Sequence, residues 1–279
     1  MQNFLRTLAI TALVLGGAAQ AEEVKNPLKD GETWAELKGD VLGEVTPLDG
    51  GNLFSVAAPY RAHDAATVPV HIRQNPGSDA SITRMVIVVD ENPAPVVAEF
   101  EFGPGIGHVD METRVRIDQY SNLRVIAETS DGGSYMNGRF VKASGGCSAP
   151  ALKDMDAALA RAGKMRLKLF DDVAFSQAAT TGAQTSGRKQ AQVMIRHPNY
   201  SGMQRNQVTQ LFIPAFFVDE LEVFQGDERL FRMEGGISIS EDPSFRFSYI
   251  PNGATSFRVR ATDTDGNVFE RSFPAAGGA

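Results

Sequence analysis

Two stretches of the sequence decide the fold: residues 67–73, which read TVPVHIR, and residues 112–120, which read ETRVRIDQY. In the first, Val68, Val70 and Ile72 alternate with proline, histidine and arginine, and in the second Val115 and Ile117 alternate with charged residues. Successive side chains of a strand point to opposite faces of a sheet, so a period of two predicts half-buried β-strands.

The same pattern continues along the chain. Further runs with strand character occupy Ile82–Val89, Val96–Phe102, Leu123–Glu128 and Ser134–Val141, with clusters of Pro, Gly, Asn and Asp between them. In the second half, alternating apolar residues are Phe245, Phe247 and Tyr249, then Phe257, Val259 and Ala261. Short strands with closely spaced turn signals are typical of antiparallel sandwiches.

We therefore expect an all-β fold with two immunoglobulin-like or fibronectin-like antiparallel β-sandwich domains. One short helix is expected after Cys147, with Ser148 as its N-cap, Pro150 in its first turn and Gly163 at its end. Residues 176–190 contain no aromatic or large aliphatic side chain and cannot contribute much to a core. The expected organisation is a first domain over 28–172, a flexible linker over 173–190 and a second domain over 191–274.

The N-terminus has the character of an export signal. Arg6 lies in a short polar start, residues 8–18 are apolar or small, and Ala19-Gln20-Ala21 offers small residues where a signal peptidase cleaves. We expect residues 1–21 to be a signal peptide and the mature protein to be periplasmic. No segment has the roughly 20 apolar residues that a membrane span requires.

Composition excludes several classes of function. Asp and Glu total 34 against 27 Lys and Arg, a net charge of −7, which disfavours general binding to nucleic acid. The four histidines, His63, His71, His108 and His197, do not have the spacing of metal or catalytic-triad sites. Motifs of hydrolases, zinc proteases and nucleotide-binding enzymes do not occur. We expect no metal and no cofactor, and a self-sufficient enzyme is disfavoured.

The single cysteine, Cys147, is the clearest functional candidate. It lies in the segment ASGGCSAP at 143–150, where Gly145 and Gly146 leave the backbone unusually free, so an exposed sulfur is expected. A helix start directly after the cysteine would lower its pKa. From Arg139 to Lys168, seven basic residues against two acidic ones would favour both a thiolate and an anionic ligand. The alternative is an inert cysteine in a turn, with the charges merely solvated.

Three motifs follow in order in the second half: His197-Pro198 with Gly202 after it, IPAFF at 213–217 and DPSFRF at 242–247. Together with Gly145-Gly146-Cys147, they make the sequence resemble the SoxYZ sulfur carriers of thiosulfate oxidation, in the fused form associated with quinoprotein dehydrogenases. Residues 30–150 resemble SoxY and residues 190–273 resemble SoxZ. The family's cysteine arm carries a second glycine pair, which Ser148-Ala149 replaces here.

The resemblance implies a covalent carrier rather than an enzyme. Cys147 would be the sulfur attachment site, Gly145 and Gly146 would form a flexible arm, and sulfur anions would be the cargo. Periplasmic sulfur-oxidation enzymes and c-type cytochromes would be the partners, with a quinoprotein dehydrogenase as a further one. Two alternatives stay open: an accessory module that docks on a periplasmic dehydrogenase or its cytochrome without covalent cargo, and a secreted structural protein.

Overall fold

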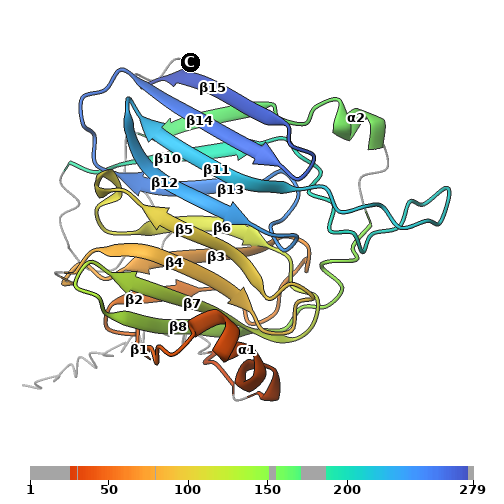
Figure 1. Ribbon diagram of the computed structural model, residues 1–279, viewed down its shortest axis with the longest axis horizontal. Helices are drawn as coiled ribbons and strands as arrows, with labels where there is room; N and C mark the ends of the chain where they lie inside the picture. The colour runs from red at the N-terminus through yellow and green to blue at the C-terminus, as the bar shows by residue number, and fades with distance from the viewer. Residues whose placement is uncertain (1–25, 30, 79, 151–154, 171–186, 276–279) are drawn as a thin grey trace, which may run out of the picture.

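The computed structural model describes residues 26–29, 31–78, 80–150, 155–170 and 187–275. In these residues, two β-sheets lie face to face (Figure 1). The first sheet has the order β1 (Leu48–Asp49), β8 (Ser134–Val141), β7 (Ser121–Thr129), β4 (Ile82–Val89), β5 (Val96–Phe102), β12 (Glu228–Gly235), β11 (Val218–Gln225), β14 (Ser256–Asp263) and β15 (Val268–Pro274). The second has the order β2 (Phe54–Ala57), β3 (Val68–Gln74), β6 (Asp110–Val115), β13 (Ser244–Tyr249), β10 (Lys189–Ile195) and β9 (Met165–Phe170).

The predicted all-β sandwich class is confirmed. Neighbouring strands pair antiparallel, apart from the two-residue β1, which is parallel to β8. Val68, Val70 and Ile72 of β3 are all 0% exposed, so the alternation that predicted this strand does place one face in the core. The helices α1 (Glu32–Leu42) and α2 (Met155–Leu159) and the short 3-10 turn η1 (Pro104–Ile106) complete the described elements. None of the helices in these parts of the chain has the length and apolar character needed to cross a membrane.

Both sheets run through the two halves of the chain without a break. In the first sheet β5 pairs with β12, and in the second β6 pairs with β13. The two halves also share one hydrophobic core, in which the ring of Phe231 lies 6.3 Å from Phe100 and 5.0 Å from Phe247. Burial of this shared apolar surface stabilises the contact between the halves.

The strands near the predicted linker follow the sheets rather than the expected boundary. β9, which falls in the predicted first domain, pairs along its whole length with β10 of the second half. β10 itself begins at Lys189, two residues before the expected start of the second domain. The ranges of the two domains and the linker stay predictions, because residues 171–186 lie outside the described part of the chain, as does the predicted signal peptide over 1–21.

Two local departures from the expected elements shape the surroundings of Cys147. The expected helix is present only as α2 in the described residues, whereas residues 146–148 form a turn, so Cys147 does not directly precede a helix. The expected strand over 112–120 ends at Val115, because the Arg116 amide donates to Ser238 O at 2.7 Å and the Ile117 amide to Ala65 O at 2.9 Å. The chain therefore leaves the sheet at Arg116.

Candidate functional site around Cys147

The first half of the chain holds the cysteine turn by its backbone. The Gly145 amide donates to Asp118 O at 2.8 Å, and the Gly146 amide donates to Ile117 O at 3.0 Å. The Cys147 amide lies 3.3 Å from Asp118 Oδ1. Residues 145–147, which we call the cysteine turn, are thus fastened to the chain just after β6.

The backbone geometry of the cysteine turn explains why positions 145 and 146 are glycines. Gly145 has a φ of 77°, a left-handed conformation that other residues adopt only with strain. A Cβ on Gly146 would lie 2.2 Å from Ala65 O and 2.6 Å from Ile117 O, so no side chain fits there. In this structure the glycines allow a tight turn and a close backbone approach, and their role as a flexible arm stays a prediction.

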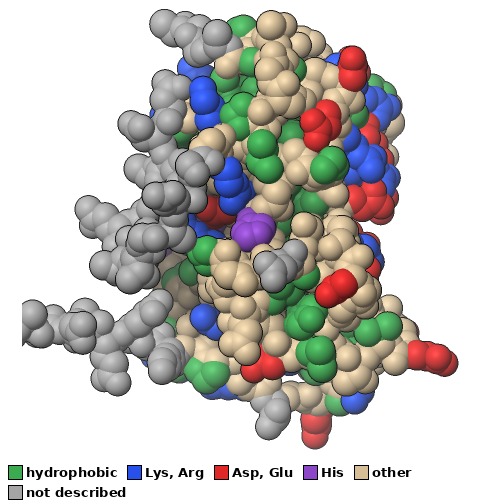
Figure 2. Space-filling view, turned by 90° about the vertical axis from the view of Figure 1, so that its left-hand side faces the viewer, with side chains coloured by type: hydrophobic (Ala, Val, Ile, Leu, Met, Phe, Trp, Pro, Cys, Tyr) green, Lys and Arg blue, Asp and Glu red, His purple; other side chains and the backbone are tan. Residues whose placement is uncertain are grey.

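The second half covers the cysteine turn from the other side. The Ser201 hydroxyl donates to the carbonyl of Cys147, and Gln204 Nε2 donates to Ala149 O at 2.9 Å. Both side chains belong to the segment between β10 and β11, which projects from one end of the sandwich (Figure 1). Figure 2 shows the opposite end, where acidic and basic side chains are intermixed mainly along the right-hand edge. The cysteine turn therefore lies where the two halves meet.

The three second-half motifs come together behind this cover. The rings of His197 and Phe216 lie 4.4 Å apart, and the His197 amide donates to Asp242 Oδ1 at 3.1 Å. The Asn199 amide donates to His197 Nδ1 at 3.1 Å, and His197 Nε2 lies 3.5 Å from Asp263 Oδ2. Burial lowers the pKa of His197, so a neutral imidazole supports the segment that reaches Cys147.

The expected exposed and acidic thiol is not what the structure shows. The Cys147 side chain is 0% exposed. Burial, and next the nearby carboxylate of Asp118, raise the pKa of Cys147 to about 11, while Arg116 and a hydrogen bond from Ser238 act in the opposite direction. The thiol is therefore protonated at neutral pH, and the expectation of a thiolate favoured by a helix start is wrong.

The expected basic patch around Cys147 is spread over separate places. Arg161, Lys164 and Arg166 line a groove of about 520 Å³ together with Arg114 and Arg196. Lys142 lies over the ring of Tyr60, Arg139 bonds to Gly138 O, and Lys168 lies over the ring of Phe170, while Lys153 is outside the described residues. The cation that lowers the pKa of Cys147 is Arg116, which is not one of the seven basic residues counted from Arg139 to Lys168.

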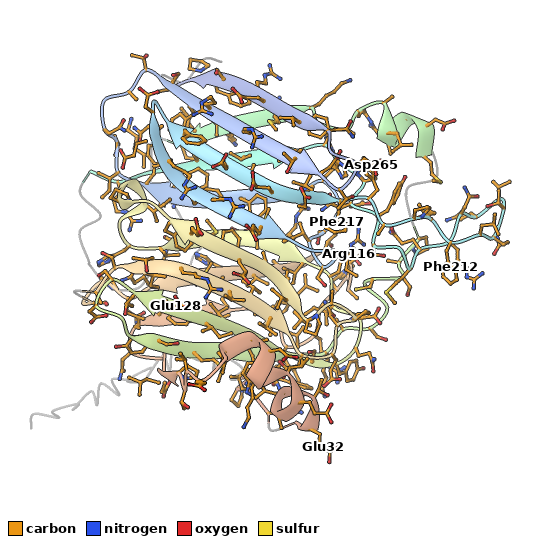
Figure 3. The ribbon with its side chains drawn as sticks, in the orientation of Figure 1. Glu32, Arg116, Glu128, Phe212, Phe217 and Asp265 are labelled. Atoms are coloured by element: carbon orange, nitrogen blue, oxygen red, sulfur yellow. The ribbon has the colours of Figure 1, made fainter. Side chains whose placement is uncertain are left out.

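Arg116 is a site residue that the sequence did not reveal. Its side chain is only 1% exposed, and it lies at the end of the strands where the halves meet (Figure 3). Nη1 donates to Gly146 O at 3.2 Å and Nη2 to Asn199 O at 3.1 Å, so the guanidinium bridges the cysteine turn and the second half. The alternating pattern had placed Arg116 on the polar face, and nothing in the pattern signals that a second half covers that face.

The described residues contain no cluster of three or more His, Cys, Asp and Glu side chains that could hold a metal ion. His71 pairs with Asp110 at 2.6 Å on the β3–β6 ladder, well separated along the fold from the buried His197. The chemistry that the site offers is that of one buried thiol beside one buried cation.

Fold and site define a two-sheet β-sandwich protein whose single cysteine lies in a glycine turn between two halves of one chain. The family model described as sulfur oxidation protein SoxY matches residues 38–147, and the one described as sulphur oxidation protein SoxZ matches residues 178–274. The chain belongs to the SoxYZ family of sulfur oxidation proteins, with SoxY and SoxZ domains in tandem on one polypeptide.

Two solved structures are similar to parts of the chain. One is the sulfur carrier protein SoxY from Chlorobium limicola f thiosulfatophilum, with 24% identity and a TM-score of 0.33, over 39% of this chain and 94% of that one. The other is the superoxide reductase (neelaredoxin) from Ignicoccus hospitalis, with 15% identity and a TM-score of 0.29, over 39% of this chain and 90% of that one. No curated protein matches the chain.

Proposed function

We propose that this protein is a periplasmic carrier that holds intermediates of thiosulfate oxidation covalently on Cys147, while partner enzymes load and process them. In the loading step, the thiol loses its proton and its sulfur forms an S–S bond with the outer sulfur of thiosulfate. Two electrons leave to an external oxidant of the c-type cytochrome class. The product is a thiosulfonate with one negative charge on the carrier.

The observation that carries this proposal is the position of Cys147. It is the last residue of the part of the chain that matches SoxY, it follows Gly145-Gly146, and it is the single cysteine of the sequence. The turn that holds it is fixed by a small set of hydrogen bonds, with Ile117, Asp118, Ser201 and Arg116 as partners. Each such bond contributes only about 1 kcal/mol, so the turn can open at moderate cost.

Opening of the turn is a necessary part of the proposal. A thiol that is fully buried and has a pKa of about 11 is a poor nucleophile at neutral pH. Separation of the cysteine turn from Asp118 and from the core would restore a pKa closer to the ordinary value of 9.0. We infer that partner enzymes act on the open turn.

The test is intact-mass analysis of the protein isolated from its native compartment or incubated with thiosulfate and oxidised c-type cytochrome. Reductant-labile additions should map to the peptide that contains Cys147 and should be absent from Cys147→Ser. Sequencing the N-terminus of the isolated protein tests export, because cleavage after Ala21 is expected. If the wild-type protein still shows only free thiol when thiosulfate, the oxidant and the partner enzymes are all present, the carrier proposal is refuted.

The second candidate is a module that docks on a periplasmic dehydrogenase, and two observations favour it. Cys147 is buried, as an inert thiol would be. The segment between β10 and β11 also exposes large apolar side chains at its tip, with Val208 91%, Leu211 69% and Phe212 59% exposed. Figure 3 shows Phe212 far from the sheets, where a partner could bind it.

Binding of the purified partner, a quinoprotein dehydrogenase or its cytochrome, separates the two candidates. Phe212→Ser should weaken binding in either case, and Val268→Ser, at an exposed site on the edge strand β15, is the matched control. If Cys147→Ser binds as tightly as the wild-type protein and no sulfur is ever found on Cys147, the docking module is the correct function.

A further inference from the structure

The strongest unexplained feature of the site is the charge of Arg116. Its guanidinium is buried and, within the described part of the chain, forms no ion pair with a carboxylate. Its two hydrogen bonds go to neutral backbone carbonyls, and Nε has no hydrogen-bond partner there. A buried charge without a counter-ion is costly, so most buried arginines are paired.

Arg124 shows what a compensated arginine looks like in the same protein. It is also buried, at 4% exposed, but Nε lies 2.8 Å from Asp90 Oδ1 and Nη2 lies 2.9 Å from Asp90 Oδ2. The Asp90 carboxylate supplies a negative charge in direct contact with the guanidinium, and Arg116 has no such contact within the described residues. Glu241, Cys147 and Asp64 interact electrostatically with Arg116, but among the described residues no carboxylate is in direct contact with its guanidinium. The contrast indicates that Arg116 has room for a negatively charged group in direct contact.

Resting on the proposed carrier function, we propose that Arg116 is the counter-ion of the anionic sulfur adduct on Cys147 and thereby selects negatively charged cargo. Loading replaces a neutral thiol with a monoanion next to Gly146, whose carbonyl already accepts from Arg116 Nη1. A thiosulfonate needs room that the closed turn does not leave, so the turn shifts. As the Gly146 carbonyl moves away, Nη1 joins Nε as a free donor toward the anion.

The position of the guanidinium suits this role. The bond from Nη2 to Asn199 O anchors it to the second half while the cysteine turn moves. Electrostatic coupling between Arg116 and Cys147 already exists in the unloaded protein, and burial lowers the pKa of Arg116. A negative charge at Cys147 would remove the penalty that burial imposes on this cation.

The test compares two adducts that differ in charge and are installed by chemical reagents. Cys147 is converted to a sulfonatoethyl disulfide, which is anionic, or to a hydroxyethyl disulfide, which is neutral. If the buried thiol does not react in the folded protein, the protein is labelled in urea and then refolded. The melting temperature of the wild-type protein should be higher with the anionic adduct by about 3–5 °C, which corresponds to about a tenfold change in an equilibrium constant. Dithiothreitol should release the anionic adduct about tenfold more slowly than the neutral adduct, once each rate is divided by the rate for the same adduct in urea.

Variants assign the difference to Arg116. The advantage of the anionic adduct should disappear in Arg116→Gln and be partly kept in Arg116→Lys. It should be unchanged in Arg114→Gln, which removes the same charge two residues earlier on β6. A merely structural role for Arg116 would shift both adducts equally. If Arg116→Gln does not fold, the wild-type comparison and the lysine variant still decide the question.

Equal melting temperatures of the two adducts in the wild-type protein, or an advantage that survives in Arg116→Gln, would overturn the inference. Because the adducts come from reagents, this outcome is independent of native loading. A protein that never carries sulfur in its native compartment would refute the carrier proposal and leave the charge comparison standing.

Discussion

The tight approach of Gly146 to the core gives the sharpest prediction about the cysteine turn. In Gly146→Ala, the new methyl group would lie 2.2 Å from Ala65 O and 2.6 Å from Ile117 O, and both contacts are with backbone that cannot rotate away. Overpacking of this kind costs about 1–3 kcal/mol. Opening of the turn relieves the clash, so the free energy of opening should fall by about that amount.

The size of the effect follows from the burial of Cys147. Because the sulfur is 0% exposed, a small alkylating reagent reacts only with the open turn, and its rate follows the population of that state. A decrease of about 1.4 kcal/mol raises that population tenfold. Gly146→Ala should therefore be alkylated about tenfold to hundredfold faster than the wild-type protein.

The assay is the rate of iodoacetamide labelling, measured by intact mass, with the circular dichroism spectrum as a check on folding. Ser144→Ala is the matched control, because Ser144 is an exposed residue of the same loop. Its labelling rate should equal that of the wild-type protein. A folded Gly146→Ala protein with the wild-type rate would refute the closed turn as the barrier to reaction.

Four further predictions follow from the same contacts. Ser201→Ala removes the hydroxyl that donates to Cys147 O, worth about 1 kcal/mol, and should speed labelling about fivefold, as the same assay will measure. The pKa of Cys147 is raised from 9.0 to about 11, so urea denaturation should show stability falling as pH rises through this interval, with less loss in Cys147→Ser. The pKa of His197 is lowered from 6.5, so stability should also fall as pH drops below about 6.5, and less so in His197→Gln if that variant folds. After cleavage at a protease site engineered between Ser176 and Ser186, the two fragments should elute together in size-exclusion chromatography, because they share both sheets and a core.

Most strands could be predicted because each depends on local alternation. Ile82–Val89, Val96–Phe102 and Ser134–Val141 were predicted with the bounds that β4, β5 and β8 have in the structure. The joining of the two halves could not be predicted in the same way. Pairing of β5 with β12 depends on contacts between residues more than a hundred positions apart, and periodicity carries no information about such partners.

The site was only partly predictable for a related reason. The sequence indicated Cys147, Gly145 and Gly146 as candidates, because a single cysteine directly after two glycines is a local pattern in the sequence. The predicted environment of the cysteine is wrong, because exposure of the sulfur and a low pKa were inferred from neighbours in sequence. The neighbours in space are Asp118, Arg116 and the second half, and they bury the thiol.

Covalent fusion of the two halves has a direct physical consequence for this site. Ser201, Gln204 and Asn199 reach Cys147, Ala149 and Arg116 from the second half, so this cover over the turn exists only when both halves are together. In two separate subunits this cover would be lost on dilution, whereas in one chain its formation is intramolecular and independent of protein concentration. Closure of the turn should therefore persist at any dilution, and the labelling rate of Cys147 should be the same at nanomolar and micromolar protein. A rate that rises on dilution would show instead that the cover comes from the second half of another molecule.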